Sequence, residues 1–468
     1  MPVTRVHLIG ICGTAMATLA AMLKQKGLAV RGSDEHVYPP MSTFLEQEGI
    51  PILNGYDAAH VTTDLDLVVI GNAISRGNPE LEEVLDRKIR YCSLPEAVRE
   101  QFLWGARSIV VAGTHGKTTT TALAGWLLVH AGLDPSVLVG GIAANLGEHG
   151  ASYRLGRGRD FVIEGDEYDS AFFDKTAKFL KYLPDIAVIA NIEFDHADIY
   201  EDLEAVHLAF RRLANLVPRN GLLLLGADSP DAAALAPVAR SKVETFGLAD
   251  GADWFAYDLS SSAAGMTFRA QHRGAPLGVF RIAMAGAHNV KNALAALAIA
   301  TAAGVEAETA REGLAAFAGV KRRLETVGSA RGVTVLDDFA HHPTAVRETL
   351  AAVRASHPAA RIWAVFEPRS ASSCRRVFQD AFAASFAAAD EVVIAQVYRG
   401  QLPADQRLSP ERLVEDLAAA GRHARFVPDV RSIVDLLARE VRDGDIVVVM
   451  SNGGFGGIHQ QLLAALQP

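Results

Sequence analysis

The chain is poor in cysteine and contains no long apolar run, and each shortage excludes a class of protein. Only three cysteines occur among 468 residues, Cys12, Cys92 and Cys374. They are too scattered for a disulfide framework or a CxxC metal site, so we expect a reducing compartment, the cytoplasm. Apolar stretches such as 186–190 and 446–450 have strand length, far below the roughly 20 residues that span a bilayer. We therefore expect neither a signal peptide nor a membrane partner.

An excess of positive charge is also missing. Lysine and arginine number 45 against 54 aspartates and glutamates, a net charge of −9. Such a chain has no overall basic field to attract a phosphate backbone, so nucleic acid is not expected as a partner. No fixed-period repeat is present, which excludes solenoids and propellers. What remains is a composition ordinary for globular protein, 50% hydrophobic and 21% charged.

Short Val/Ile-rich runs alternate with longer Ala/Leu-rich helical patterns along the whole chain. This alternation predicts an α/β protein with mostly parallel sheets and crossover helices. The length predicts two to four domains at roughly 100 to 200 residues each. Strands followed by glycine turns, and a new strand near residue 333, divide the chain into three. We predict a Rossmann-like domain over 1–105, a central domain with a phosphate loop over 106–321, and a second Rossmann-like domain over 322–468.

The sharpest local motif lies between a predicted buried strand and a helix. It reads Gly113, Thr114, His115, Gly116, Lys117, Thr118, Thr119. The backbone N–H groups of such a turn bind anions, Lys117 can neutralise β- and γ-phosphates, and the Thr118 hydroxyl can ligate Mg²⁺. The spacing is shorter than the full Walker pattern, because Val111 stands where its first glycine would be. The alternative is an ordinary glycine-rich turn. The position of the motif, between a buried strand and a helix, disfavours this alternative.

Polar clusters follow two further predicted strands. One is the acidic segment 164–169 and the other the segment 191–196, Asn-Ile-Glu-Phe-Asp-His. Alone, an acidic turn is more often a solvated loop and a single histidine more often structural. The carboxyl ends of parallel strands meet at one edge of a sheet, however, so these clusters and the phosphate loop are expected to converge. Carboxylates at that edge suit Mg²⁺.

Three other glycine or histidine turns are less specific. The segment 10–16 resembles a dinucleotide fingerprint but lacks its third glycine, so it indicates a nucleotide more than a nicotinamide. Asp34 lies 21 residues after Gly13, where an acid could bind a ribose hydroxyl. The turns 337–343 and 451–459 each follow a strand of the third domain. His341 and His342 in the first of them have no CxxC or HExxH frame to support a zinc site.

Taken together, these motifs resemble the Mur ligase family, whose members join an amino acid or peptide to a UDP-sugar carboxylate using ATP. The matching pieces occur in the family's order and cover nearly the whole chain: 113–119, 164–169, 191–196, 286–292, 319–323 and 337–343. A nicotinamide oxidoreductase would leave the phosphate loop unexplained. A regulator without catalysis would need no intact set of lysine, threonine and carboxylates.

Within the family, the segments 10–14, 38–43, 164–174, 367–370 and 451–459 resemble most the branch that uses a tripeptide. The resemblance implies ATP-dependent joining of L-alanyl-γ-D-glutamyl-meso-diaminopimelate to UDP-N-acetylmuramate through an acyl phosphate, with release of ADP and phosphate. This reaction belongs to peptidoglycan recycling. The alternative is the UDP-N-acetylmuramate:L-alanine ligase of de novo synthesis. Mg²⁺ is the implied metal, and a monomer or weak homodimer the expected state.

The resemblance also implies roles for individual residues. Catalysis falls to Lys117, Glu164, His196 and Arg322, and metal binding to Thr118, Glu164 and His196. ATP binding falls to the phosphate loop with His288, Asn289 and Asn292, UDP-sugar binding to Gly13, Thr14, Ser33, Asp34 and Ser75, and acceptor binding to His341, His342 and Arg369. Several family members carry a carbamylated lysine after the Asp-His motif, whereas residues 197–220 contain no lysine. Either the arrangement of the alanine-adding branch applies or metal binding differs here.

Overall fold

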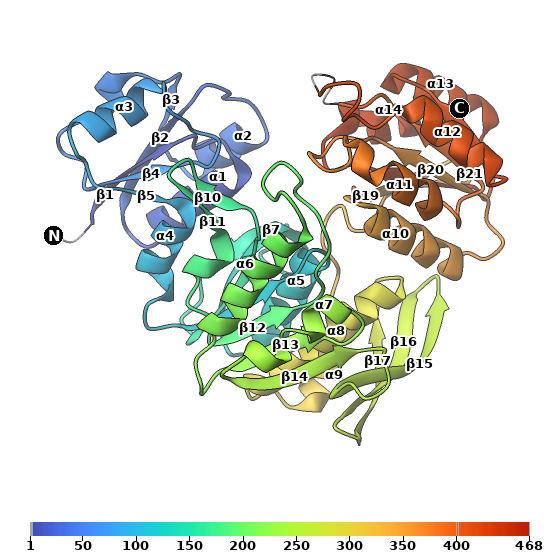
Figure 1. Ribbon diagram of the computed structural model, residues 1–468, viewed down its shortest axis with the longest axis horizontal. Coiled ribbons are helices and arrows are strands. Elements are labelled where there is room, and N and C mark those ends of the chain that lie inside the picture. The colour runs from blue at the N-terminus through green and yellow to red at the C-terminus, as the bar shows by residue number, and fades with distance from the viewer. Residues whose placement is uncertain (1–2, 399, 401, 468) are drawn as a thin grey trace.

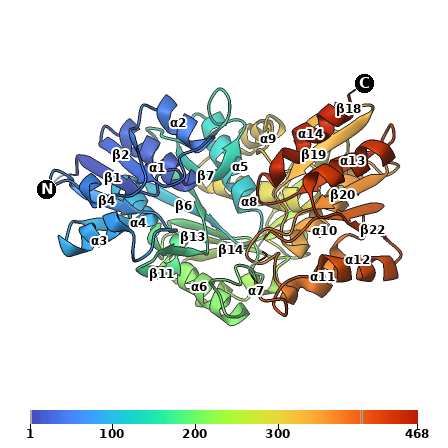
Figure 2. The same cartoon turned by 90° about the horizontal axis from the view of Figure 1, so that it is seen from above.

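Three α/β units make up the molecule, and the computed structural model describes residues 3–398, 400 and 402–467 of it. The first and third units lie on opposite sides above the central one (Figure 1). The view from above keeps this order along the long axis (Figure 2). The α/β class and the three mostly parallel sheets predicted from the sequence are therefore confirmed.

The first unit is a five-stranded parallel sheet in the order β3-β2-β1-β4-β5. Its elements are β1 (Arg5–Ile9), α1 (Thr14–Gln25), β2 (Ala29–Asp34), α2 (Met41–Gln47), β3 (Ile52–Asn54), β4 (Leu67–Ile70), α3 (Pro79–Asp86), β5 (Tyr91–Ser93) and α4 (Leu94–Val98). The strand order reverses between β1 and β4, and such a switch point is where open α/β sheets bind ligands. The glycine turn after β1 lies there, with Gly10 at a φ of 82°.

The central unit is a ten-stranded sheet in the order β17-β16-β15-β14-β13-β12-β6-β9-β7-β8. Its strands are β6 (Arg107–Ala112), β7 (Ser136–Ala143), β8 (Ala151–Arg154), β9 (Asp160–Gly165), β12 (Ile186–Ile189), β13 (Leu222–Gly226), β14 (Lys242–Gly247), β15 (Trp254–Ser262), β16 (Gly265–His272) and β17 (Ala275–Ile282). Its helices are α5 (Lys117–His130), α6 (Leu203–Leu216), α7 (Pro230–Ala233), α8 (Ala287–Ala302) and α9 (Ala307–Ala315). A small hairpin of β10 (Asp169–Ala171) and β11 (Asp174–Ala177) extends from it.

The third unit is a six-stranded sheet in the order β18-β19-β23-β20-β21-β22, in which only the edge strand β18 is antiparallel to its neighbour. Its strands are β18 (Glu325–Ala330), β19 (Val333–Asp338), β20 (Ile362–Phe366), β21 (Glu391–Ile394), β22 (His423–Phe426) and β23 (Ile446–Met450). Its helices are α10 (Pro343–Ser356), α11 (Gln379–Ser385), α12 (Pro410–Ala419), α13 (Val430–Glu440) and α14 (Ile458–Ala465). We keep residues 105 and 322 as proposed domain boundaries.

The two junctions between the units differ in chemistry. One apolar cluster runs from the first sheet into the central one and includes Leu19, Leu103, Phe161 and Phe179. The third unit has apolar clusters of its own. Phe194 of the central unit packs against one of them, and the third unit's other contacts with the central unit include hydrogen bonds and ion pairs. Within the described part of the chain, no helix is long and apolar enough to cross a bilayer.

A buried polar cluster fixes the end of β2 in the first unit. Glu80 has no exposed surface, and it accepts hydrogen bonds from the Ser33 hydroxyl at 2.6 Å and from the rings of His7 and His60 at 2.8 and 2.7 Å. Burial would raise the pKa of Glu80, but these donors lower it below its usual value. The Ser33 side chain is thus directed into the protein rather than toward a ligand.

Removing the buried acceptor should destabilise the first unit. We expect Glu80→Ala to cost about 3 to 5 kcal/mol, because it leaves the buried donors Ser33 and His7 and the partly buried His60 without this partner. The measurement is the midpoint of urea unfolding. Glu82→Ala is the control, since Glu82 pairs with the exposed Arg76 and a surface pair of this kind adds little to stability. Equal midpoints for the two variants would contradict this account of the cluster.

Candidate active site

The three strand ends predicted to converge do so. Strand β6 pairs with β9 on one side and β12 on the other, with Ala112 level with Gly165 and Ile189. The phosphate loop and the two polar clusters therefore leave the sheet side by side. They line a cavity of about 1370 Å³ that also includes Thr14 and Asn72 of the first unit and residues 338–341 and 370–372 of the third.

The phosphate loop depends on two glycines. Gly113 and Gly116 have φ values of 133° and 83°, which favour residues without a β-carbon. A β-carbon on Gly116 would also lie 2.5 Å from the Asn292 amide oxygen. That oxygen accepts a hydrogen bond from Thr120 at 3.2 Å, so α8 is packed directly against the loop. The first N–H groups of the 14-residue helix α5 are thereby presented to the cavity, as an anion site requires.

A buried ion pair connects the three strand ends. The Lys117 ammonium donates to the Gly113 carbonyl at 2.7 Å and to the Glu167 carboxylate at 2.8 Å, and the His196 ring lies 3.3 Å from the same carboxylate. Burial opposes the charge on each group. The mutual attraction outweighs it, raising the pKa values of Lys117 and His196 and lowering the pKa of Glu167. Sequence reasoning included Glu167 in its acidic cluster but gave it no role.

Glu164 and Thr118 fit a divalent cation. The Glu164 carboxylate accepts from the Thr118 hydroxyl at 2.9 Å and from the Gly140 N–H at 2.7 Å. Burial and the neighbouring Asp166 raise the pKa of Glu164, because no positive charge offsets its own closely enough. A hard cation would remove that penalty, and carboxylate with hydroxyl oxygen is a donor set that suits Mg²⁺. His196 makes its contact with Glu167 instead.

Two adjacent arginines lie between the central and third units and point to different partners. Arg323 donates to the Thr118 hydroxyl at 3.1 Å. Arg322, at a φ of 62°, donates to the carbonyls of Ser451 and Gly453 at 2.6 and 2.7 Å. Both line the large cavity. The family resemblance implied a catalytic role for Arg322, whereas in this structure Arg323 is the arginine in contact with the phosphate loop.

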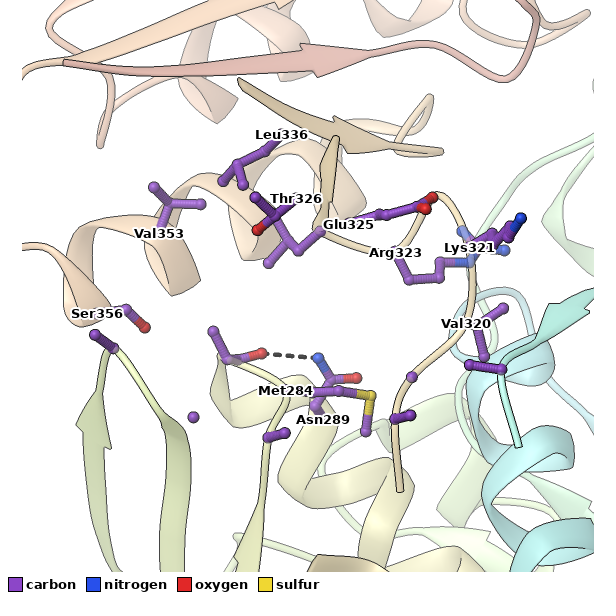
Figure 3. A pocket seen from close by; sticks show the side chains of 18 of the residues that line it. Met284, Asn289, Val320, Lys321, Arg323, Glu325, Thr326, Leu336, Val353 and Ser356 are labelled. Atoms are coloured by element: carbon purple, nitrogen blue, oxygen red, sulfur yellow. Dashed lines mark hydrogen bonds between the residues drawn. The ribbon is translucent and has the colours of Figure 1, made fainter. Parts of the chain in front are cut away.

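A second, smaller cavity of about 360 Å³ adjoins this connection. Figure 3 shows Met284 and Asn289 lining it from the central unit and Leu336 and Val353 from the third. Val320, Lys321 and Arg323 run along its side. The chain that joins the two units thus borders this cavity on one side, although Val320 itself is buried in the core of the central unit.

Polar side chains meet across the same junction. Thr344 at the start of α10 donates to Glu193 at 2.6 Å, and Ser372 donates to Asp195 at 2.5 Å. His341 lies 3.7 Å from Asp195, and its attraction overcomes burial and holds the pKa of Asp195 well below its usual range. Burial together with His115 lowers the pKa of His342 to about 4. His341 lines the large cavity, beside segments of the central unit.

The three residues outside the phosphate loop that are expected to bind ATP lie at the start of α8. His288, Asn289 and Asn292 all line the cavity. Asn292 donates to the Asn289 side chain at 3.0 Å, which in turn donates to the Ala285 carbonyl at 2.7 Å. Burial lowers the pKa of His288 to about 4, so its ring is neutral near pH 7.

The expected UDP-sugar residues are more dispersed. Thr14 lines the cavity, and Gly13 precedes it as the N-cap of α1. The Asp34 carboxylate accepts from the backbone N–H groups of Cys12 and His36 at 2.8 and 2.9 Å, which shapes the glycine turn. Ser75 is exposed and lies outside the residues that line the cavity.

Arg369, expected at the acceptor end, has its guanidinium 3.7 Å from the Tyr398 ring centroid and 3.6 Å from Glu367. A β-carbon on Gly453 would lie 2.0 Å from its Nε, so this glycine makes room for the arginine. Arg369 is not among the residues that line the cavity, but the adjacent Ser370 is.

The sequence and the fold agree with one enzyme class. The Mur ligase family pattern for its catalytic domain matches residues 5–102, the middle-domain pattern matches 111–300, and the glutamate ligase domain pattern matches 322–453. The chain belongs to the Mur ligase family.

Comparison with individual relatives shows which branches of the family the chain is similar to. The chain is 42% identical, over 99% of its length and 98% of the relative's, to the UDP-N-acetylmuramate–L-alanyl-γ-D-glutamyl-meso-2,6-diaminoheptandioate ligase of Escherichia coli. It is 35% identical, over 98% and 99%, to the UDP-N-acetylmuramate–L-alanine ligase of Desulfitobacterium hafniense. Among solved structures, a murein peptide ligase from Psychrobacter arcticus superposes with a TM-score of 0.73 at 37% identity, covering 99% of this chain and 98% of that one. A UDP-N-acetylmuramate–alanine ligase from Thermotoga maritima gives 0.80 at 25% identity, covering 98% of both.

The His196–Glu167 contact gives a pH-dependent prediction. In Glu167→Gln the carboxylate charge that contacts the ring is gone while burial still opposes the charged form, so we expect the pKa of His196 to fall. NMR titration of the His196 ring protons in a chelating buffer measures it. Glu201→Gln, at an exposed position of the same loop, is the control and should leave the titration unchanged. A His196 titration unaltered by Glu167→Gln would contradict the assigned pair.

Proposed function

We propose that this protein joins the tripeptide L-alanyl-γ-D-glutamyl-meso-diaminopimelate to UDP-N-acetylmuramate at the expense of ATP, in peptidoglycan recycling. The observation that carries the proposal is the 42% identity to the tripeptide ligase over nearly the whole of both chains, against 35% for the alanine ligase. Members of the family are ATP-dependent amide ligases, and this chain is one of them.

The alanine-adding reaction is the second candidate, because the Thermotoga maritima alanine ligase has the higher TM-score. That score compares backbones over all three units at once, so it responds to how the units are placed and not to the side chains at the acceptor end. The identity comparison includes those side chains. The identity comparison therefore favours the reaction with the tripeptide as acceptor.

The site supports an activation step at the phosphate loop. A carboxylate oxygen of the sugar attacks the γ-phosphorus of ATP, the β–γ bond breaks, and ADP leaves. Lys117 and the N–H groups at the start of α5 would stabilise the negative charge that moves onto the phosphate oxygens. Thr118 and Glu164 would hold Mg²⁺, which neutralises phosphate charge when bound. The Lys117–Glu167 pair keeps the ammonium charged and fixed in position.

The second step forms the amide. The peptide's amino nitrogen attacks the acyl carbon, the bond to the phosphate oxygen breaks, and the nitrogen releases a proton. The acceptor would enter from the third unit, where His341 and the 370–372 segment line the cavity. His341 faces Asp195, whose pKa is depressed, so this carboxylate stays ionised and orients the imidazole.

Loss of the loop lysine should abolish the activation step. We expect Lys117→Ala to lower kcat by two decades or more, because it deletes a preorganised charge that the transition state uses. Phosphate release at saturating ATP measures it, and circular dichroism confirms folding, since Glu167 is left buried without its lysine. Lys175→Ala is the control, because that side chain is two-thirds exposed, at 67%. A Lys117→Ala rate above half that of wild type would overturn the phosphate-loop assignment.

The acceptor assay tests the proposed function itself. We expect kcat/KM for the tripeptide to exceed that for free L-alanine, and Arg369→Ala to raise the tripeptide KM about tenfold or more by removing a partner for its carboxylates. The KM values for ATP and UDP-N-acetylmuramate should hardly change. Arg412→Ala is the control, because this arginine is exposed on α12. Equal kcat/KM for tripeptide and L-alanine would favour the alanine ligase.

A further inference from the structure

Three possible metal ligands meet where the phosphate loop contacts the third unit. His115 lies in the loop after β6, Glu193 in the segment after β12, and His342 is the N-cap of α10. Their ligand atoms all lie within 4.8 Å of one another. His115 belongs to the phosphate loop and His342 is expected to bind the acceptor, but neither role explains why both rings meet Glu193. The triad shares no residue with the Thr118 and Glu164 pair that suits Mg²⁺.

The two separations from the carboxylate are close to those of a tetrahedral metal site, and the two histidine nitrogens lie within 4.8 Å of each other. The Glu193 Oε2 atom lies 3.5 Å from His115 Nε2 and 3.5 Å from His342 Nδ1. Ligands at about 2.0 to 2.1 Å from a tetrahedral Zn²⁺ are separated by about 3.3 Å. Small side-chain shifts would therefore complete the coordination. His115 Nε2 is buried and has no hydrogen-bond partner among the residues that the structure describes, so an ion would satisfy it.

Neighbouring groups already orient two of the ligands. The far nitrogen of His342, Nε2, donates to the Phe194 carbonyl at 3.2 Å, which leaves Nδ1 with its lone pair. Metal-binding histidines are commonly fixed in this way by a backbone carbonyl. The Thr344 hydroxyl donates to Glu193 at 2.6 Å and holds the carboxylate in place. An ion would displace only the long 3.3 Å hydrogen bond from the Thr344 N–H to Nδ1.

The donor set decides which ion fits. Two imidazole nitrogens and one carboxylate suit zinc and similar transition metals, whereas Mg²⁺ prefers oxygen ligands and keeps several waters. His115 and Glu193 line the large cavity, so a fourth position is open to water on that side. We propose that His115, Glu193 and His342 form a Zn²⁺ site that links the third unit to the phosphate loop. Because its ligands come from both sides of the junction, the bound ion holds the two units together.

The test is metal binding by the full chain without substrates. ZnCl₂ is titrated calorimetrically in millimolar MgCl₂, and CoCl₂ replaces it to give a visible spectrum that reports coordination geometry. We expect one Zn²⁺ per chain, a tetrahedral Co²⁺ spectrum and a raised Tm with Zn²⁺. Glu193→Gln, which keeps the side chain's shape, should weaken binding at least tenfold. His115→Gln serves as a second ligand variant, and each must match the wild-type circular dichroism and Tm in chelator.

His341→Gln is the matched control, because this neighbour of His342 faces Asp195 instead and should leave Zn²⁺ binding unchanged. Three results would overturn the proposal. One is wild-type protein that binds no Zn²⁺ above the Mg²⁺ background. Another is equal affinity in wild type and in both ligand variants. The last is binding that Glu164→Gln abolishes and Glu193→Gln does not, which would place the ion beside Thr118.

Discussion

The contact between Lys117 and Glu167 is the interaction on which the arrangement of the site depends. It joins the loop after β6 to the loop after β9, and through His196 it includes the loop after β12. Each of these charges would be unfavourable in the buried site without the other two. The pair also keeps the lysine ammonium beside the backbone N–H groups of the phosphate loop, so that positive charge is concentrated where an anion would bind.

The sequence predicts the fold class and the meeting of the three strand ends, because both follow from local patterns. Val/Ile runs mark the strands, and any residue directly after a parallel strand must lie at the carboxyl edge of the sheet. Lys117, Glu164 and the 191–196 segment are placed by that rule alone. The relationship to the Mur ligase family is likewise visible in the ordered motifs, and the comparisons confirm it.

Contacts that depend on side-chain direction could not be predicted in this way. Arg322 and Arg323 are adjacent in a turn outside any strand, where side-chain directions follow no regular alternation, so the sequence could not show which one contacts Thr118. Ser33 is directed inward by Glu80, a residue 47 positions later. The sequence singled out Glu164 in the acidic cluster and left Glu167 without a role, since adjacent residues of a loop have no fixed orientation. Glu193 and His342 are 149 positions apart, and only the folded junction brings them together.

The junction between the first and central units and the junction between the central and third units differ in how well the chain can be divided into separately expressed fragments. Leu103 and the Phe102–Phe161 ring contact belong to an apolar cluster shared by the first and central units. Expressing residues 1–105 alone would expose this surface to water and favour aggregation. The third unit shares less apolar surface with its neighbour: Phe194 of the central unit packs against its cluster, with the Phe194 and Phe378 ring centroids 6.1 Å apart. The other contacts described at this junction are hydrogen bonds and ion pairs, which water can replace on separation. The third unit is the one to express alone for crystallisation or isotope labelling, and the first two are best kept as one piece.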